Sequence, residues 1–318
     1  GSAGPVSPQK SRILLIALLL GLAVPAVWIY FIETTNTTVR GRQDVEDLAV
    51  PFVGEIPLAY PKNKYHLPFH KSHKDLDMVV VRPRNRDVIN EAFRVARANL
   101  EFMCDSSKCN VLMTTSFNVG SGKSFSSLNM AISLALKSKR VCIVDMDLRK
   151  RTISRYVKAP KIGVTEFLSF KLEDLGSVIM HDNLAKNLDV LPAGSTPPNP
   201  TELLYSENMS KMVEYLRVHY DYVFLDCPPV EIVADTSIVA PFADHTMFII
   251  RAGLLDRSML PTVDRYYESK KYKGMVLLLN ATDINSRTSY NRYGYNYGHR
   301  YGYGYGYGYG GGYGYGYG

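Results

Sequence analysis

The sequence predicts an α/β protein in which a mostly parallel sheet, built around a phosphate-binding loop (P-loop), carries helices on both faces. One transmembrane helix is predicted before it, and a disordered tyrosine–glycine tail after it. Residues 87–285 alternate nearly continuous aliphatic runs with helical patterns, as buried parallel strands and their connecting helices do. Residues 13–32 contain no charged side chain, and residues 286–318 are dominated by tyrosine and glycine.

The segment Ile13–Ile32 is predicted to span a membrane. Its length, at 1.5 Å per residue, matches the ~30 Å hydrocarbon core of a bilayer, and Trp28 and Tyr30 suit a membrane interface. A signal peptide would be shorter and would show a cleavage pattern of small residues, and a core helix is rarely apolar on every side. Basic residues flank both ends, so the orientation stays open.

Five segments are expected along the chain. They are a cloning remnant with a linker (1–12), the membrane helix (13–32), a juxtamembrane linker (33–86), the P-loop domain (87–285) and the tail (286–318). The linker is polar and interrupted by proline, so little core of its own is expected there.

The P-loop domain is expected to contain six strands and four helices. The strand-like runs are residues 110–115, 140–147, 188–194, 221–229, 245–253 and 274–280. The helical patterns are residues 87–103, 124–138, 200–220 and 258–273, the first with Asp87 as its N-cap.

The most specific motif is "NVLMTTSFNVGSGKSFSS", where a strand ends, a glycine turn follows and a helix begins. Backbone N–H groups of such a loop cradle phosphates, Lys123 would reach the β/γ oxygens and Ser124 would bind Mg²⁺. Phe117 stands where the usual motif has its first glycine. The predicted nucleotide-binding residues are Gly120, Ser121, Gly122, Lys123, Ser124 and Phe125.

Acidic residues lie near the ends of two later predicted strands, residues 140–147 and 221–229. Asp145 and Asp147 close "VCIVDMD", and Asp226 closes "YVFLD" in the manner of a Walker B acid. The carboxyl ends of parallel strands share one edge of a sheet, where ligands bind. One carboxylate of the first pair could order a metal while the other accepts a proton. Capping of the following helix is the alternative for that pair.

Together these motifs resemble the bacterial protein-tyrosine kinases (BY-kinases), the cytoplasmic modules of capsular and exopolysaccharide co-polymerases. "SGKS", "IVDMDLR" and "FLDCPP" match their three Walker-type motifs, and "LPAGSTPPNPTELL" resembles a family segment. The resemblance runs from about Val39 to the end of the chain. It implies a fold related to the partition and division-site ATPases, whose signature lysine is replaced here by Asn118. It also implies an extracytoplasmic region that precedes this chain.

The resemblance implies roles for the site residues. Lys123 would hold phosphates, Ser124 and Asp226 would serve Mg²⁺, and the pair Asp145 and Asp147 would be catalytic. We assign Asp145 as general base and Asp147 as metal-linked, and keep Asp145 among the candidate metal ligands because the pattern does not divide the roles.

Two further features have a family interpretation and a simpler one. "EAFRVAR" matches the family's E-x-x-R-x-x-R helix, so Glu91, Arg94 and Arg97 are predicted to contact a neighbouring subunit in a ring. A solvated charged face with local ion pairs is the alternative. Asn280 could bind adenine, by analogy, or could simply cap its strand.

The tail carries twelve of the 23 tyrosines, and no acidic residue follows Asp283. Alternating glycine leaves the backbone mobile and the hydroxyls in water. The predicted phosphate acceptors are Tyr293, Tyr295, Tyr297, Tyr301, Tyr303, Tyr305, Tyr307, Tyr309, Tyr313, Tyr315 and Tyr317. An adhesive tail for self-association is the alternative.

The prediction is an ATP- and Mg²⁺-dependent tyrosine autokinase at the inner membrane, with its kinase domain in the cytoplasm. It would phosphorylate neighbouring tails, be reversed by a cognate phosphatase and regulate capsular or exopolysaccharide assembly. The four cysteines lack zinc-type spacing, which favours reduced thiols, and no dense basic run indicates nucleic acid. The alternatives are a P-loop ATPase of the partition type with an adhesive tail, and a non-catalytic membrane adaptor.

Overall fold

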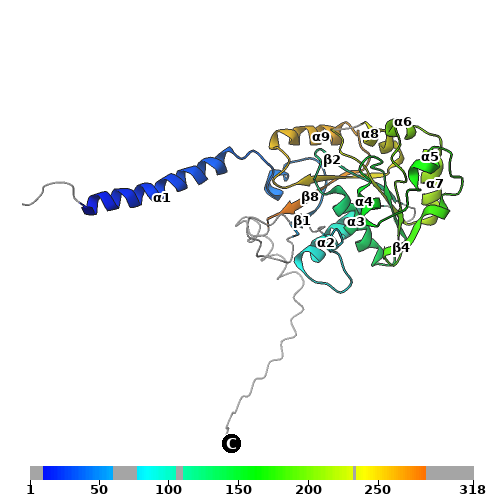
Figure 1. Ribbon diagram of the computed structural model, residues 1–318, viewed down its shortest axis with the longest axis horizontal. Coiled ribbons are helices and arrows are strands. Elements are labelled where there is room, and N and C mark those ends of the chain that lie inside the picture. The colour runs from blue at the N-terminus through cyan, green and yellow to red at the C-terminus, as the bar shows by residue number, and fades with distance from the viewer. Residues whose placement is uncertain (1–9, 60–76, 105–109, 232–233, 284–318) are drawn as a thin grey trace, which may run out of the picture. The chain divides into compact units, whose positions relative to one another are not determined.

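A computed structural model describes residues 10–59, 77–104, 110–231 and 234–283 (Figure 1). Its core is an eight-stranded sheet with the order β1-β8-β7-β2-β6-β3-β5-β4. The strands are β1 (Phe52–Pro57), β2 (Asn110–Ser116), β3 (Val141–Asp145), β4 (Met180–Ala185), β5 (Leu188–Leu191), β6 (Tyr222–Asp226), β7 (His245–Arg251) and β8 (Met275–Thr282). Only β4 runs antiparallel to its neighbour, so the predicted mostly parallel sheet is confirmed.

Helices cover both faces of this sheet. The α-helices are α1 (Lys10–Thr35), α2 (Val88–Met103), α3 (Lys123–Ala135), α4 (Thr152–Tyr156), α5 (Val164–Leu168), α6 (Pro200–Leu203), α7 (Asn208–His219), α8 (Asp235–Val239) and α9 (Leu260–Glu268). The apolar side chains of α2 and α3 pack on one face, and those of α5, α7 and α9 pack on the other. Asp87 caps α2 by accepting a hydrogen bond from the Asn90 backbone N–H, as predicted.

The strands that carry the predicted site are neighbours at the centre of the sheet. β6 lies between β2 and β3, and Asp226 is the register partner of both Thr114 and Asp145. Parallel strands end at one edge, so the loops that follow β2, β3 and β6 emerge side by side. This topology, and not sequence proximity, assembles the site.

The segment expected to be a linker, residues 33–86, contains part of the domain instead. β1 adds a parallel edge strand to β8, and the backbone N–H of Val39 donates to the carbonyl of Leu255 at 2.8 Å. Val39 has no exposed surface. Gly54 is required in β1 because an added Cβ would lie 2.9 Å from the Cβ of Ala96 on α2. Glycine and proline inside this short strand hide its pattern from the sequence.

Other elements also differ from the sequence prediction. The short helices α4, α5 and α8 were not expected. β4 is a polar edge strand with no aliphatic run to announce it, as edge strands commonly are. The helix expected over residues 200–220 is two helices, α6 and α7. Ser206 lies between them, where its hydroxyl donates to the Leu168 carbonyl and accepts from the Asn208 N–H. This local hydrogen bonding competes with a continuous helix.

The apolar helix α1 agrees with the predicted membrane span. Its segment Arg12–Phe31 covers 20 residues, and none of that surface is buried in the structure. By length and composition it can cross a bilayer. The tail tyrosines from Tyr290 onward, and Cys109, lie outside the described residues.

Candidate nucleotide and phosphoryl-transfer site

The P-loop joins the end of β2 to the start of α3. Gly120 and Gly122 adopt left-handed backbone conformations, with φ of 80° and 85°. Inside the loop, the hydroxyls of Ser116 and Ser121 both donate to the Asn118 carbonyl at 2.9 Å. The loop therefore holds a turned backbone before α3 begins at Lys123, as a phosphate cradle requires.

Two side chains from distant strands brace this loop. The Asn280 side-chain N–H, on β8, donates to the Ser121 carbonyl at 2.9 Å, and Arg251 at the end of β7 donates to the Gly120 carbonyl at 2.6 Å. Asn280 thus supports the loop in this structure, and its contact with adenine stays a prediction. Sequence reasoning missed Arg251, because only the pairing of β7 with its neighbours brings it to the loop.

Phe117 occupies the position of the first glycine in the usual P-loop motif, and its ring packs in the core. Its side chain is 3% exposed and packs edge-on against Phe248, with ring centroids 5.2 Å apart. It also lies 5.7 Å from the Tyr266 ring. The front of the loop is therefore anchored in the core on the α9 side. The partly buried Phe125 ring also packs toward the core, with its centroid 5.9 Å from that of Phe93.

The hydroxyl of Ser124 and the carboxylates form one cluster. Ser124 Oγ donates to Asp226 Oδ2 at 2.5 Å, and Ser127 Oγ, which sequence reasoning missed, donates to Asp226 Oδ1 at 3.3 Å. Asp145 Oδ2 accepts from the backbone N–H and hydroxyl of Ser154 at 2.8 and 2.7 Å. Asp147 Oδ1 accepts from the Lys150 N–H at 2.9 Å.

Asp145 therefore caps the first turn of α4, and Asp147 caps the turn that precedes α4, in keeping with the simpler expectation for this pair. Capping uses only one of the two carboxylate oxygens of Asp145, however. Its Oδ1 atom is buried and has no hydrogen-bond partner among the described residues. A buried carboxylate oxygen without a partner is costly unless a ligand or metal meets it. This free oxygen fits a site that binds MgATP.

The electrostatics agree with an ion-binding cluster. Burial raises the pKa of Asp145 to about 6. Burial and the charge of Asp145 raise the pKa of Asp226 to about 7, against the opposing effects of Ser124 and Lys123. Burial lowers the pKa of Lys123, while Asp226 and Asp147 oppose that shift. A cation that replaces protons here would relieve this repulsion, and Mg²⁺ prefers such oxygen ligands.

The predicted oligomer contacts lie on α2, apart from this cluster. Glu91 and Arg94 form an ion pair at 2.5 Å and stay partly exposed. Arg97 differs from the expectation, because its side chain is only 14% exposed and donates to the Ser133 carbonyl on α3 at 2.7 Å. The helical wheel places Arg97 on the polar face, but α3 packs against that side and turns Arg97 into a link between two helices.

Comparison with known proteins decides the family. Residues 109–252 match the family model described as an AAA domain. The tyrosine-protein kinase CpsD of Streptococcus agalactiae is 33% identical over 221 residues, which cover 69% of this chain and 94% of that protein. The chain belongs to the bacterial tyrosine-protein kinases. Tyrosine kinase YwqD of Bacillus subtilis agrees, at 30% identity over 68% of this chain and 91% of that protein.

Solved tyrosine kinase structures show the same fold. The kinase domain of Escherichia coli tyrosine kinase ETK has a TM-score of 0.67 and 26% identity, covering 78% of this chain and 96% of that one.

Tyrosine-protein kinase wzc of Salmonella typhimurium, a longer sequence relative, matches 92% of this chain at 28% identity, but this chain spans only 41% of its length. This chain is therefore a tyrosine kinase with an ATP-binding P-loop, as its sequence predicted.

The contact between Gly122 and Asn280 yields a test of the loop. A Cβ at Gly122 would lie 2.1 Å from Asn280 Nδ2, whereas a Cβ at Gly120 would meet nothing within 4 Å. Both positions carry the backbone strain of a left-handed alanine, about 1–2 kcal/mol. Gly122→Ala is therefore expected to weaken ATP binding more than tenfold, and Gly120→Ala clearly less, in calorimetric titrations. Equal losses in both variants would show that the Asn280 contact is unimportant.

Proposed function

We propose that this kinase is an ATP- and Mg²⁺-dependent autokinase that phosphorylates the tyrosine-rich tails of neighbouring copies. The observation that carries the proposal is the gathering of Lys123, Ser124 and the carboxylates of Asp145 and Asp226 at adjacent strand ends. Relatives that are named tyrosine-protein kinases favour this function over a partition-type ATPase or a passive adaptor.

The residues divide the work as follows. Lys123 and the loop N–H groups would bind the β- and γ-phosphates, and Ser124 and Asp226 would hold Mg²⁺, with Asp147 linked to it. When bound, the magnesium nucleotide supplies the phosphoryl group and neutralises its charge. Asp145 would accept the phenol proton through its free Oδ1, and a pKa near 6 suits a base at neutral pH. A phenol oxygen–phosphorus bond forms as the bond to ADP breaks.

The sequence of the tail supports its role as substrate. Tyrosine recurs every second residue over most of 301–318. Residues 290–318 number 29, and at roughly 3.3 Å per residue they would reach about 95 Å when extended, which is enough to enter the site of a neighbouring copy. Each phosphate adds about −1.5 to −2 charges, so heavy modification would drive neighbouring tails apart.

The apolar helix α1 supports a membrane anchor, and the family resemblance supports an inner-membrane location with the kinase domain in the cytoplasm. The family resemblance supports a homo-oligomeric ring, a partner phosphatase and control of capsular or exopolysaccharide assembly. Of the three motif residues on α2, Glu91 and Arg94 stay partly exposed for a ring contact, while Arg97 would act by fixing α2 to α3.

Mass spectrometry of the C-terminal peptide tests this function. Incubation with MgATP is expected to produce phosphotyrosine between Tyr293 and Tyr317, and EDTA is expected to prevent it. A tail that stays unmodified while ATP is hydrolysed to free phosphate would contradict the autokinase proposal.

A further inference from the structure

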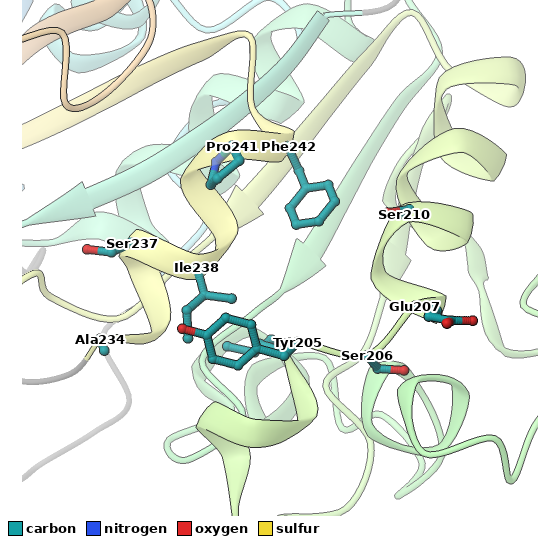
Figure 2. A pocket seen from close by; sticks show the side chains of 10 residues that line it. Tyr205, Ser206, Glu207, Ser210, Ala234, Ser237, Ile238, Pro241 and Phe242 are labelled. Carbon is teal, nitrogen blue, oxygen red and sulfur yellow. The ribbon is translucent and has the colours of Figure 1, made fainter.

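A groove lies between the turn that joins α6 to α7 and the helices α8 and η3 (Ala240–Phe242). Its cavity volume is about 460 Å³. Tyr205, Ile238 and Phe242 supply apolar surface, and Figure 2 shows their side chains converging on one space. Ser206, Glu207 and Ser210 also line the groove, and in Figure 2 the Glu207 carboxylate points outward at its edge. Tyr205 is 73% exposed, so most of its ring is open to a partner.

The rim of this groove is joined to the catalytic loop. Arg149, two residues after Asp147, donates to the carboxylate of Asp235 at 3.4 Å and to the hydroxyl of Thr201 at 3.1 Å. Thr201 in turn donates to Asp235 at 2.6 Å. Thr201 belongs to α6 and Asp235 begins α8, so these bonds tie both walls of the groove to the loop after β3.

We propose that this groove, the Tyr205 groove, docks one tyrosine of a neighbouring copy's tail while another tyrosine of that tail reaches the catalytic carboxylates. This inference rests on the proposed function. A tyrosine ring would pack against Tyr205, Ile238 and Phe242, because aromatic side chains favour offset or edge contacts. Its hydroxyl would face the polar side of the groove at Ser210, which suits a side chain that is apolar in body and polar at its tip.

The charge of the groove fits the unmodified tail. The tail contains Arg287, Arg292 and Arg300 and no acidic residue, whereas Glu207 is exposed at the edge of the groove. A phosphotyrosine would bring about −1.5 to −2 charges beside that carboxylate. The groove therefore favours unmodified tyrosine and releases the product.

Because tyrosine and glycine alternate in the tail, docking does not require one particular tyrosine to enter the groove. In an extended chain, tyrosines two residues apart are about 6.6 Å apart along the strand and point the same way. Whichever tyrosine docks, other tyrosines lie at regular steps from it along the tail. One groove thus serves many acceptors without a fixed sequence position, and successive shifts of the tail would present successive tyrosines.

The test uses full chains in detergent. An active donor is mixed with a tagged Lys123→Met acceptor, and the initial rate of tail labelling on the acceptor is measured. Tyr205→Ala in the donor is expected to lower this rate about three- to tenfold, the loss of an aromatic contact. The same substitution placed in the acceptor is expected to change nothing, because the acceptor's groove is not used. Val218→Ala, at an exposed position on α7, is the matched control.

Equal losses with Tyr205→Ala in donor and acceptor would indicate a contact between subunits that does not involve the tail, and would overturn the inference. An unchanged rate in the donor variant would do the same.

A second measurement does not depend on kinase activity. A photo-reactive benzoylphenylalanine at position 205 of the Lys123→Met chain is expected to crosslink to residues 288–318 of an isotopically labelled neighbour, and one at position 218 is not. Crosslinks elsewhere would refute the docking site. Crosslinks without phosphotyrosine in the active enzyme would instead refute the proposed function.

Discussion

Replacement of Lys123 by methionine is expected to lower phosphotyrosine formation by about 10²–10³-fold or more, which is the usual cost of removing one group that stabilises transition-state charge. Lys123 begins α3 and interacts electrostatically with Asp226 and Asp147. Methionine fills a similar space but carries no charge to offer a phosphate. Anti-phosphotyrosine blotting and mass spectrometry of the tail would measure the loss.

Lys137→Met is the matched control for this variant. Lys137 follows α3, is half exposed, and pairs with Glu101 at 2.9 Å. Such a surface ion pair contributes about 1 kcal/mol or less, so near-normal phosphorylation is expected. Circular dichroism should show both variants folded. A Lys123→Met chain that still phosphorylates its tail would place the nucleotide site elsewhere.

Replacement of Asp226 by asparagine is expected to lower kinase activity but to raise the stability of the nucleotide-free protein. The variant should lose about 10²–10³-fold in activity, because Ser124 and the metal would lose their carboxylate partner. Without nucleotide, however, it should melt at a higher temperature than the wild type at pH 8. Asp226 is 1% exposed, and its folded pKa of about 7 lies above the ordinary value of 3.8.

The pH dependence follows from that raised pKa. Between about pH 4 and 7 the folded protein holds a proton on Asp226 that the unfolded chain has lost, so the wild type loses stability as pH rises through this window. The advantage of asparagine should therefore be small at pH 4 and reach its full size above pH 7. Each kcal/mol corresponds to about 2–4 °C in Tm for a domain of this size. Scanning calorimetry in EDTA would measure it.

Asp221→Asn is a suitable comparison, because Asp221 immediately precedes the same strand at its other end. Hydrogen bonds and charge from Arg140 outweigh partial burial and lower the pKa of Asp221. Its loss should destabilise the protein slightly at pH 8 and leave phosphorylation intact. If Asp226→Asn were instead the less stable variant at pH 8, the carboxylate cluster would not be the source of repulsion described above.

Much of the site was predictable because its motifs are local. A P-loop needs a strand, a glycine turn and a helix start in immediate succession, so the segment from Asn110 to Ser124 encodes its own conformation. Asp145 and Asp226 end aliphatic strands, and the general geometry of parallel sheets brings strand ends together. The apolar length of α1 and the composition of the tail are likewise properties of the chain alone.

Other features depended on which elements become neighbours. Asn280 supports a carbonyl 159 residues away, at Ser121, because β8 lies two strands from β2. Arg97 faces inward because α3 covers it, and β1 joins the sheet although its sequence contains glycine and proline. The sequence by itself determined the P-loop and the acidic strand ends, since each of these motifs is encoded in one continuous segment. Only the tertiary structure decided what braces that chemistry, because burial and hydrogen-bond partners come from segments that the local pattern cannot see.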